Sequence, residues 1–144
     1  MLELKTQMKR LNLLFSETDA AYHEAALKLG LSDSAMLILY TVCSQGGACP
    51  LNDITHTSGV SKQTINSALR KLETEGMVRL ETIGARRKRV CLTESGKELA
   101  ERTVFRLIKA ENEILGSWSE EEQTLYMELT HRYLISFKEK LEEM

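Results

Sequence analysis

The chain has 144 residues, of which 42% are hydrophobic and 28% charged, and its formal net charge is −2. These values are typical of a single folded domain that is long enough to bury its own core. No apolar run approaches the roughly 20 residues that would span a bilayer, so the sequence predicts no membrane segment.

The N-terminal stretch MLELKTQMKRLNLLFSETD mixes acids and bases among its apolar residues, which is not typical of a signal peptide. The three cysteines, Cys43, Cys49 and Cys91, are odd in number and lack C-x-x-C spacing. This pattern favours a reduced protein with free thiols. The sequence therefore predicts a cytoplasmic protein.

The first part of the chain is predicted to be helical. Apolar residues between Leu4 and Ala25 recur at alternating steps of three and four, which indicates a long amphipathic helix that Gly30 ends. Ser32 or Ser34 is expected to cap a second helix through AMLILYTVCS. That segment is apolar on nearly every side, so we expect it to lie in the core.

Two further helices are predicted in the middle of the chain. The stretch QGGACP interrupts the second helix, and a short helix, LNDITHTS, follows Pro50 and stops at Gly59. Ser61 is expected to cap a helix of about four turns, SKQTINSALRKLETEG, with Gly76 as its C-cap. Its buried stripe is expected to comprise Ile65, Ala68, Leu69 and Leu72.

A two-stranded hairpin and two long helices are predicted for the rest. MVRLETI and RVCL resemble strands joined through Gly84. One long helix is expected from Thr93, its cap, to Trp118, and Ser119 opens the last helix in a capping box with Glu122. Four consecutive cations lie at the hairpin turn and just after it: Arg86, Arg87, Lys88 and Arg89.

The order of helix, turn, capped helix and basic hairpin predicts a winged helix-turn-helix. A B-DNA major groove admits one α-helix, and its base edges bind short polar side chains, Arg and Lys. A hairpin beside that helix can place arginines along the DNA backbone or in the minor groove. The face of the capped helix that is expected to be exposed carries Lys62, Gln63, Thr64, Asn66, Ser67, Arg70 and Lys71.

Positive charge is concentrated in this part of the chain. Between Ser61 and Thr93, eight Lys or Arg residues stand against three Glu, a local net charge of +5 that leaves −7 for the rest. Contact with nucleic acid depends on the local field more than on the total charge. An isolated charge run is usually a solvated surface, but its combination with a capped polar helix favours DNA binding.

The stretches GVSKQTINSALRKLETEGMVRLE and RVCLTESGKEL resemble the MarR family of bacterial transcriptional regulators. The flanking long helices are similar to the dimerisation helices of that family, although only the segment from about Gly59 to Gly96 is specific. The wing pattern of the family is D-x-R-x-x-x-V-x-L-T. Gly84 stands where the Asp is expected, the hairpin is a couple of residues shorter than usual, and the other positions hold Arg86, Val90, Leu92 and Thr93.

The resemblance implies a fold that is mainly α with a small β-hairpin wing. Residues 32–93 are expected to form the winged DNA-binding unit, and residues 1–30 and 94–144 a helical dimerisation region, all within one domain. The chain would act as a homodimer that represses transcription from a pseudo-palindromic operator of double-stranded DNA. A small, often aromatic, effector between the dimerisation helices and the winged unit would release the operator.

The resemblance also assigns roles to the polar residues. Asn66 and Ser67 are expected to face bases, whereas Ser61, Gln63 and Thr64 are expected to contact phosphates. The expected DNA-binding set is completed by Lys62, Arg70, Arg86, Arg87 and Lys88.

Two alternatives stay open. The same fold could serve as a thiol-based redox switch, or it could be a winged-helix module that binds proteins, although such modules tend to lose the basic wing. His23, His56 and His131 are scattered, so no metal site is expected. The chain lacks G-x-S-x-G, P-loop and H-E-x-x-H motifs, so neither an enzyme active site nor a cofactor is expected.

Overall fold

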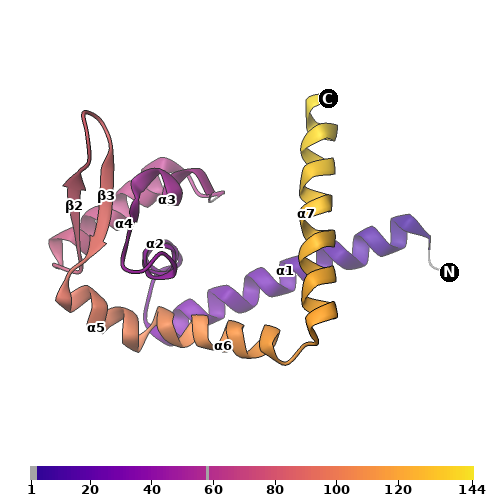
Figure 1. Ribbon diagram of the computed structural model, residues 1–144, viewed down its shortest axis with the longest axis horizontal. Coiled ribbons are helices and arrows are strands. Elements are labelled where there is room, and N and C mark those ends of the chain that lie inside the picture. Colours follow the sequence, from indigo (N-terminus) through magenta and orange to yellow (C-terminus); the bar gives the residue numbers. More distant parts are fainter. Residues whose placement is uncertain (1–2, 58) are drawn as a thin grey trace. The chain divides into compact units, whose positions relative to one another are not determined.

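The computed structural model describes residues 3–57 and 59–144, and most of them lie in helices (Figure 1). The chain divides into two compact units, of which the first ends at Leu107 and the second comprises Ile108–Met144. The elements in chain order are α1 (Leu4–Leu29), α2 (Asp33–Ser44), β1 (Ala48–Pro50), α3 (Leu51–Thr57), α4 (Lys62–Thr74), β2 (Val78–Thr82), β3 (Lys88–Leu92), α5 (Glu94–Arg102), α6 (Val104–Gly116) and α7 (Glu120–Glu142).

The ends of the first helices are set by the residues that the sequence indicates. α1 ends where Gly30 adopts a left-handed φ of 72°, which residues with a Cβ rarely adopt. The side chain of Ser32, rather than that of Ser34, caps α2 by accepting a hydrogen bond from the backbone N–H of Ala35 at 3.1 Å.

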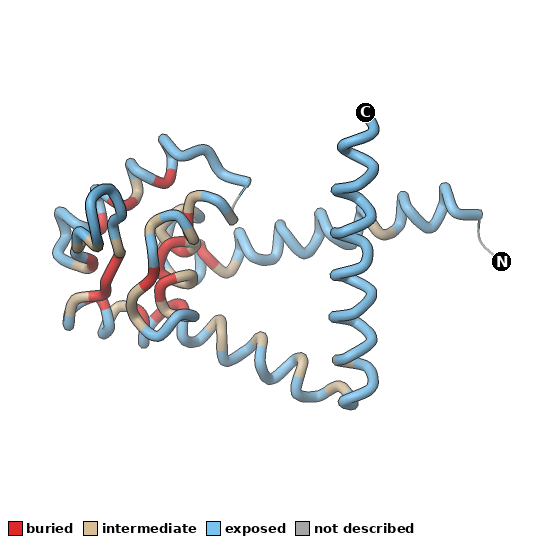
Figure 2. Tube along the Cα trace, turned by 45° about the horizontal axis from the view of Figure 1, so that its top comes forward, coloured by how far each residue is buried: buried red, intermediate tan, exposed pale blue. Residues whose placement is uncertain are grey.

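The core of the first unit is built around α2, as its apolar composition predicts. Figure 2 shows the buried residues gathered there, whereas α7 has no buried residue. The core residues with the largest fully buried side chains are Ile38, Leu39, Val42, Cys49, Ile54, Ile65, Val90 and Val104.

The sheet has three antiparallel strands in the order β1-β3-β2, one more than the sequence predicts. β1 pairs with β3 so that Cys49 lies opposite Val90, and Pro50 is the last residue of the strand. A strand of three residues ending in proline has no periodic pattern, so only its pairing partner could reveal it.

The single long helix expected after Thr93 is wrong, because α5 and α6 are separated at Thr103, where ψ is −93°. The backbone N–H of Thr103 bonds to the carbonyl of Ala100 at 3.2 Å, and its hydroxyl donates to the carbonyl of Leu99 at 2.7 Å. The hydroxyl thus takes the acceptor that an α-helical N–H would use, a known cause of helix bending. No glycine or proline marks this break in the sequence.

The second unit contains α7, whose start follows the predicted capping box. The side chain of Ser119 accepts from the N–H of Glu122 at 3.1 Å, and the Glu122 carboxylate accepts from the N–H of Ser119 at 2.8 Å. The same bonds lower the pKa of Glu122. The expected fold, a mainly α winged helix with a small wing, is confirmed.

None of the described helices is by itself long and apolar enough to cross a membrane. Only α1 and α2 taken together have the necessary length and composition, and they are bent by 90° where they meet.

Candidate nucleic-acid interface

α4 presents a polar face because its apolar side is fixed in the core. Ile65, Leu69 and Leu72 are buried, as predicted, whereas Ala68 is only partly buried. The hydroxyl of Ser61 accepts from the N–H of Thr64 at 3.2 Å, and the two hydroxyl oxygens lie 2.9 Å apart. Both hydroxyls therefore contribute to the helix cap as well as lying at the exposed end of α4.

A glycine follows the C-terminal end of α4. Glu75 is the C-cap residue, one position earlier than predicted, and Gly76 follows it with a left-handed φ of 76°. This turn leads the chain directly into β2.

The wing is a tight hairpin between β2 and β3. Thr82 pairs with Lys88 on the last rung, and the N–H of Ile83 bonds to the carbonyl of Arg87 at 2.8 Å to close the turn. Gly84 has a φ of 83° inside this turn. This backbone conformation accounts for glycine at the position where the family pattern has Asp.

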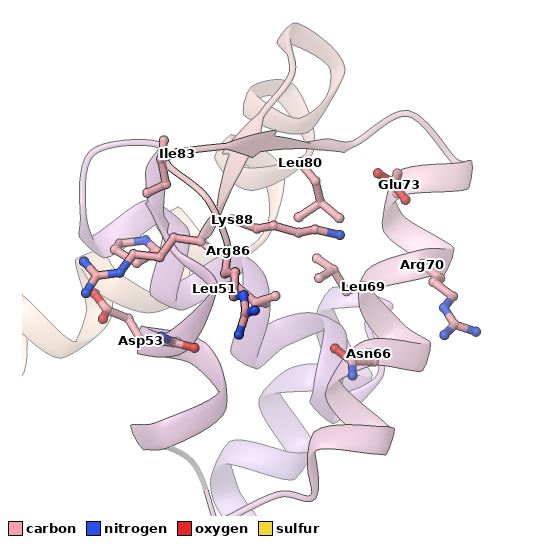
Figure 3. Close-up of a pocket in the computed structure, with 13 residues that line it drawn as sticks. Leu51, Asp53, Asn66, Leu69, Arg70, Glu73, Leu80, Ile83, Arg86 and Lys88 are labelled. Carbon is pink, nitrogen blue, oxygen red and sulfur yellow. The ribbon is translucent and has the colours of Figure 1, made fainter.

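α4 and the wing enclose a groove of about 720 Å³ (Figure 3). The start of α3 forms its third side. In Figure 3, Lys88 reaches across the groove toward Leu69, Asn66 faces the groove, and Arg70 points away from it. The lining residues are Pro50, Leu51, Asn52, Asp53, Asn66, Leu69, Arg70, Glu73, Leu80, Ile83, Arg86, Arg87 and Lys88.

The structure brings part of the expected DNA-binding set together at this groove. Asn66, Arg70, Arg86, Arg87 and Lys88 line it and are exposed. The other members are exposed on or beside α4 but do not line the groove: Ser61, Lys62, Gln63, Thr64 and Ser67.

Sequence reasoning missed the contribution of α3. Asn52 and Asp53 reach the same groove, although α3 lies well before the wing in the sequence. Only the tertiary fold brings α3 to the wing, and no short-range pattern signals it. Asp53 also accepts a hydrogen bond from Gln45 at 3.1 Å.

The wing cations fall into two electrostatic groups. Among the described residues, Arg86, Arg87 and Lys88 have no carboxylate partner at ion-pair distance. In contrast, Arg79 and Arg89 donate to the two carboxylate oxygens of Glu81 at 2.9 and 2.5 Å. These bonds lower the pKa of Glu81 to about 2. The four consecutive cations are therefore not equivalent, because Arg89 is engaged by an acid.

Burial disfavours the reactive thiolate form of two of the three cysteines. Cys49 and Cys91 are buried, and burial raises the pKa of the Cys49 thiol to about 11, with the charge of Asp53 adding to the shift. Burial also raises the pKa of Cys43. In residues 3–57 and 59–144, no three His, Cys, Asp or Glu side chains gather in a group that could hold a metal ion.

Comparison with known proteins agrees with this geometry. A family model described as MarR family matches residues 29–88. No curated protein matches the chain.

Solved structures with the same fold include regulators from several bacteria. A MarR family regulator from Neisseria meningitidis is 19% identical with a TM-score of 0.76, and the match covers 100% of both chains. The PcaV transcriptional regulator from Streptomyces coelicolor, in complex with its natural ligand, is 17% identical with a TM-score of 0.60, covering 93% of this chain and 96% of that one.

A third similar structure concerns regulation of DNA binding. It is that of BpsR from Bordetella bronchiseptica, whose DNA binding is regulated by 6-hydroxynicotinic acid. It is 18% identical with a TM-score of 0.62, and the match covers 86% of this chain and 98% of that one. Likeness at these identities establishes the fold alone, and the family model matches the middle of the chain, residues 29–88.

Proposed function

We propose that the protein is a sequence-specific DNA-binding repressor of the MarR family of transcriptional regulators, whose family model matches residues 29–88. The observation that carries the proposal is the groove at which the exposed cations of the wing turn and the polar face of α4 come together. Phosphates would engage Arg86, Arg87 and Lys88, while Asn66 on α4 would read a base edge.

The proposed assembly is a homodimer on a pseudo-palindromic operator. Two copies of α4 would enter successive major grooves on one side of the duplex, and each wing would contact the flanking backbone. The support for a dimer is the apolar surface of α1 and α7. Large hydrophobic side chains remain exposed there, among them Leu4, Phe15, Leu125, Tyr133 and Phe137.

An effector would act by changing the distance between the two recognition helices. Both helices must reach their grooves together, so a small change in spacing can abolish binding. The complex of PcaV with its natural ligand supports a small-molecule effector, and the regulation of BpsR DNA binding by 6-hydroxynicotinic acid supports an aromatic one. We place the protein in the cytoplasm, where its DNA target lies, and assign it no enzymatic activity.

The thiol-switch alternative receives no support from the environments of Cys43 and Cys49. A thiol with a pKa of about 11 is almost fully protonated at neutral pH, and the thiolate is the reactive form. The protein-interaction alternative is disfavoured because the wing turn keeps three cations that no acid of the described chain neutralises by an ion pair.

The proposal is tested by measuring DNA affinity across a salt series. Fluorescence anisotropy would compare a duplex selected by the protein from a random library with a scrambled duplex. The Arg86→Ala and Arg87→Ala double variant is expected to weaken binding to both. It should also flatten the log-log salt dependence by about 0.9 for each phosphate that the wing no longer binds.

A control variant separates a local effect from a general loss of charge. Lys97→Ala with Arg102→Ala removes two cations from exposed positions of α5, outside the groove. This variant is expected to keep the salt dependence of the unaltered protein. Equal flattening in both variants, or loss of cognate affinity alone in the wing variant, would contradict the assigned role of the wing.

A further inference from the structure

Glu81 holds two arginines on one face of the wing. Its Oε1 accepts from Arg79 at 2.9 Å, and its Oε2 accepts from Arg89 at 2.5 Å. Glu81 lies directly opposite Arg89 in the β2–β3 register, and Arg79 precedes it by two residues. Alternate residues of a strand lie on the same face, so the three side chains form a continuous ion-paired row.

This row lies on the opposite face of the hairpin from the groove. Leu80 and Lys88 line the groove, and each is a sequence neighbour of a member of the row. Because successive side chains point to opposite faces of a sheet, Glu81 and Arg89 face away from the groove. The Glu81–Arg89 pair is nevertheless close to the turn, because only the pair of Thr82 and Lys88 lies between it and the turn.

A released Arg89 would therefore start only one residue from the DNA-facing tip. The Arg79 side chain is 58% exposed, and that of Arg89 is 44% exposed, although the Arg89 Nε is itself buried and has no hydrogen-bond partner among the described residues. The ion pairs with Glu81 are what distinguishes these two arginines from the cations of the turn.

DNA phosphate cannot easily replace the carboxylate. Hydrogen bonds between guanidinium and carboxylate are charge-assisted on both sides, and Glu81 contacts both partners at once. An arginine that turned to a phosphate would exchange one anion for another and leave Glu81 with a single partner. With a pKa of about 2, Glu81 stays ionised at every pH at which a duplex is stable.

We propose that Glu81 limits the number of wing arginines that DNA phosphates can engage, because it holds Arg79 and Arg89 in ion pairs on the face away from the groove. The inference rests on the proposed DNA-binding function. It assigns the phosphate contacts of the wing to the turn, residues 86–88, and makes Glu81 a determinant of overall DNA affinity and of its salt dependence.

The test is the salt dependence of the Glu81→Gln variant on a short scrambled duplex, measured by fluorescence anisotropy on the full chain. The variant is expected to bind more tightly than the unaltered protein. Its log-log slope should be steeper by about 0.9 for each arginine that gains a phosphate. A purely structural role for Glu81 would have the opposite effect, because a loosened wing loses affinity.

Two control variants define the source of the gain. Glu75→Gln removes one negative charge from the exposed C-cap of α4 without releasing an arginine, so its slope should stay unchanged. Adding Arg79→Gln and Arg89→Gln to Glu81→Gln should return the slope to that of the unaltered protein. An unchanged or flatter slope in folded Glu81→Gln, or an equal steepening in Glu75→Gln, overturns the inference.

Single arginine variants decide the matter if Glu81→Gln does not fold. Arg89→Gln should keep the slope, whereas Arg87→Gln should flatten it by about 0.9. Equal flattening in both would overturn the inference while leaving the proposed function intact. Absence of any DNA binding by the unaltered chain would instead contradict the proposed function, and this inference with it.

Discussion

Asn66 is the residue of α4 through which we expect sequence preference to act. Its amide faces the groove in Figure 3 and is exposed, and it can both donate and accept at an adenine edge. Asn66→Ala is therefore expected to cost about 1–3 kcal/mol on the selected duplex and little on a scrambled one.

Thr74→Ala provides the control for Asn66, since Thr74 lies in the last turn of the same helix and outside the groove. Binding isotherms of both variants on both duplexes check the assignment. Equal losses on the two duplexes would show that Asn66 acts on the backbone rather than on a base.

Gly96 is the residue at which the fold leaves no space for a side chain. A Cβ there would overlap the carbonyl oxygen of Met77, so backbone atoms would have to move. Gly96→Ala is expected to lower the free energy of unfolding by about 1–3 kcal/mol or more, as measured by urea denaturation.

Gly116→Ala is the matched control for Gly96. It places the same methyl group at the end of α6, where no atom lies within 4 Å. Alanine is favoured over glycine in helices, so we expect no loss of stability. Comparable destabilisation by both substitutions would show that the close approach at Met77 is not the cause.

At the scale of elements, the wing hairpin should respond to acid through Glu81. The pKa of Glu81 in the folded protein is about 2, below its ordinary value of 4.5. Its contribution to stability is therefore fully present above about pH 4.5 and is lost as the pH falls toward 2. The difference in Tm between the unaltered protein and Glu81→Gln should be constant from pH 7 to 5 and shrink below that range.

Calorimetry at several pH values checks this prediction. Glu75→Gln is again the control, because the structure gives Glu75 no ion pair among the described residues. A difference in Tm that persists unchanged at pH 2 would mean that the effect of Glu81 does not come from its charge.

The elements that the sequence predicts well are those with local signals. Ser32, Ser61 and Ser119 cap helices through bonds to residues three positions ahead, and such caps depend on nearby residues alone. β1 exists because β3 pairs with it, and the break at Thr103 depends on one hydroxyl. Neither leaves a periodic trace in the sequence.

In the candidate site, too, some residue positions follow from local sequence patterns and others only from the tertiary structure. The polar face of α4 follows from the spacing of its apolar residues, so the exposed position of Asn66 could be predicted. Arg89 lies opposite Glu81 whereas its neighbour Lys88 lines the groove, and this difference depends on the strand register. The contribution of Asn52 to the groove depends on the packing of α3 near the wing. Both require the tertiary structure.

At the scale of the whole molecule, exposed apolar side chains predict assembly. α7 carries exposed Leu125, Leu129, Tyr133, Phe137 and Leu141 in one row, and α1 carries a further set. A monomer rarely leaves a surface of this kind in water. We therefore expect a symmetric dimer with a mass of twice 16.3 kDa.

Charge placed in this row should disrupt the dimer. Tyr133→Glu with Phe137→Glu is expected to give a monomeric or aggregating product that loses affinity for the selected duplex. Light scattering after size exclusion provides the mass. Thr124→Glu with His131→Glu introduces the same acids on α7 outside the row and should remain dimeric; a monomeric mass for the unaltered chain would contradict the prediction.

The order of the strands has a consequence for the solubility of the protein. β2 lies at the edge of the sheet, and an edge strand offers unpaired backbone groups to which another chain can add a strand. Arg79 and Glu81 alternate along this edge, so an incoming strand would have to pass beside charged, mutually paired side chains. The ion-paired row that restrains the wing arginines thus also disfavours the addition of a strand from another molecule. A variant with apolar residues at Arg79 and Glu81 is therefore expected to aggregate.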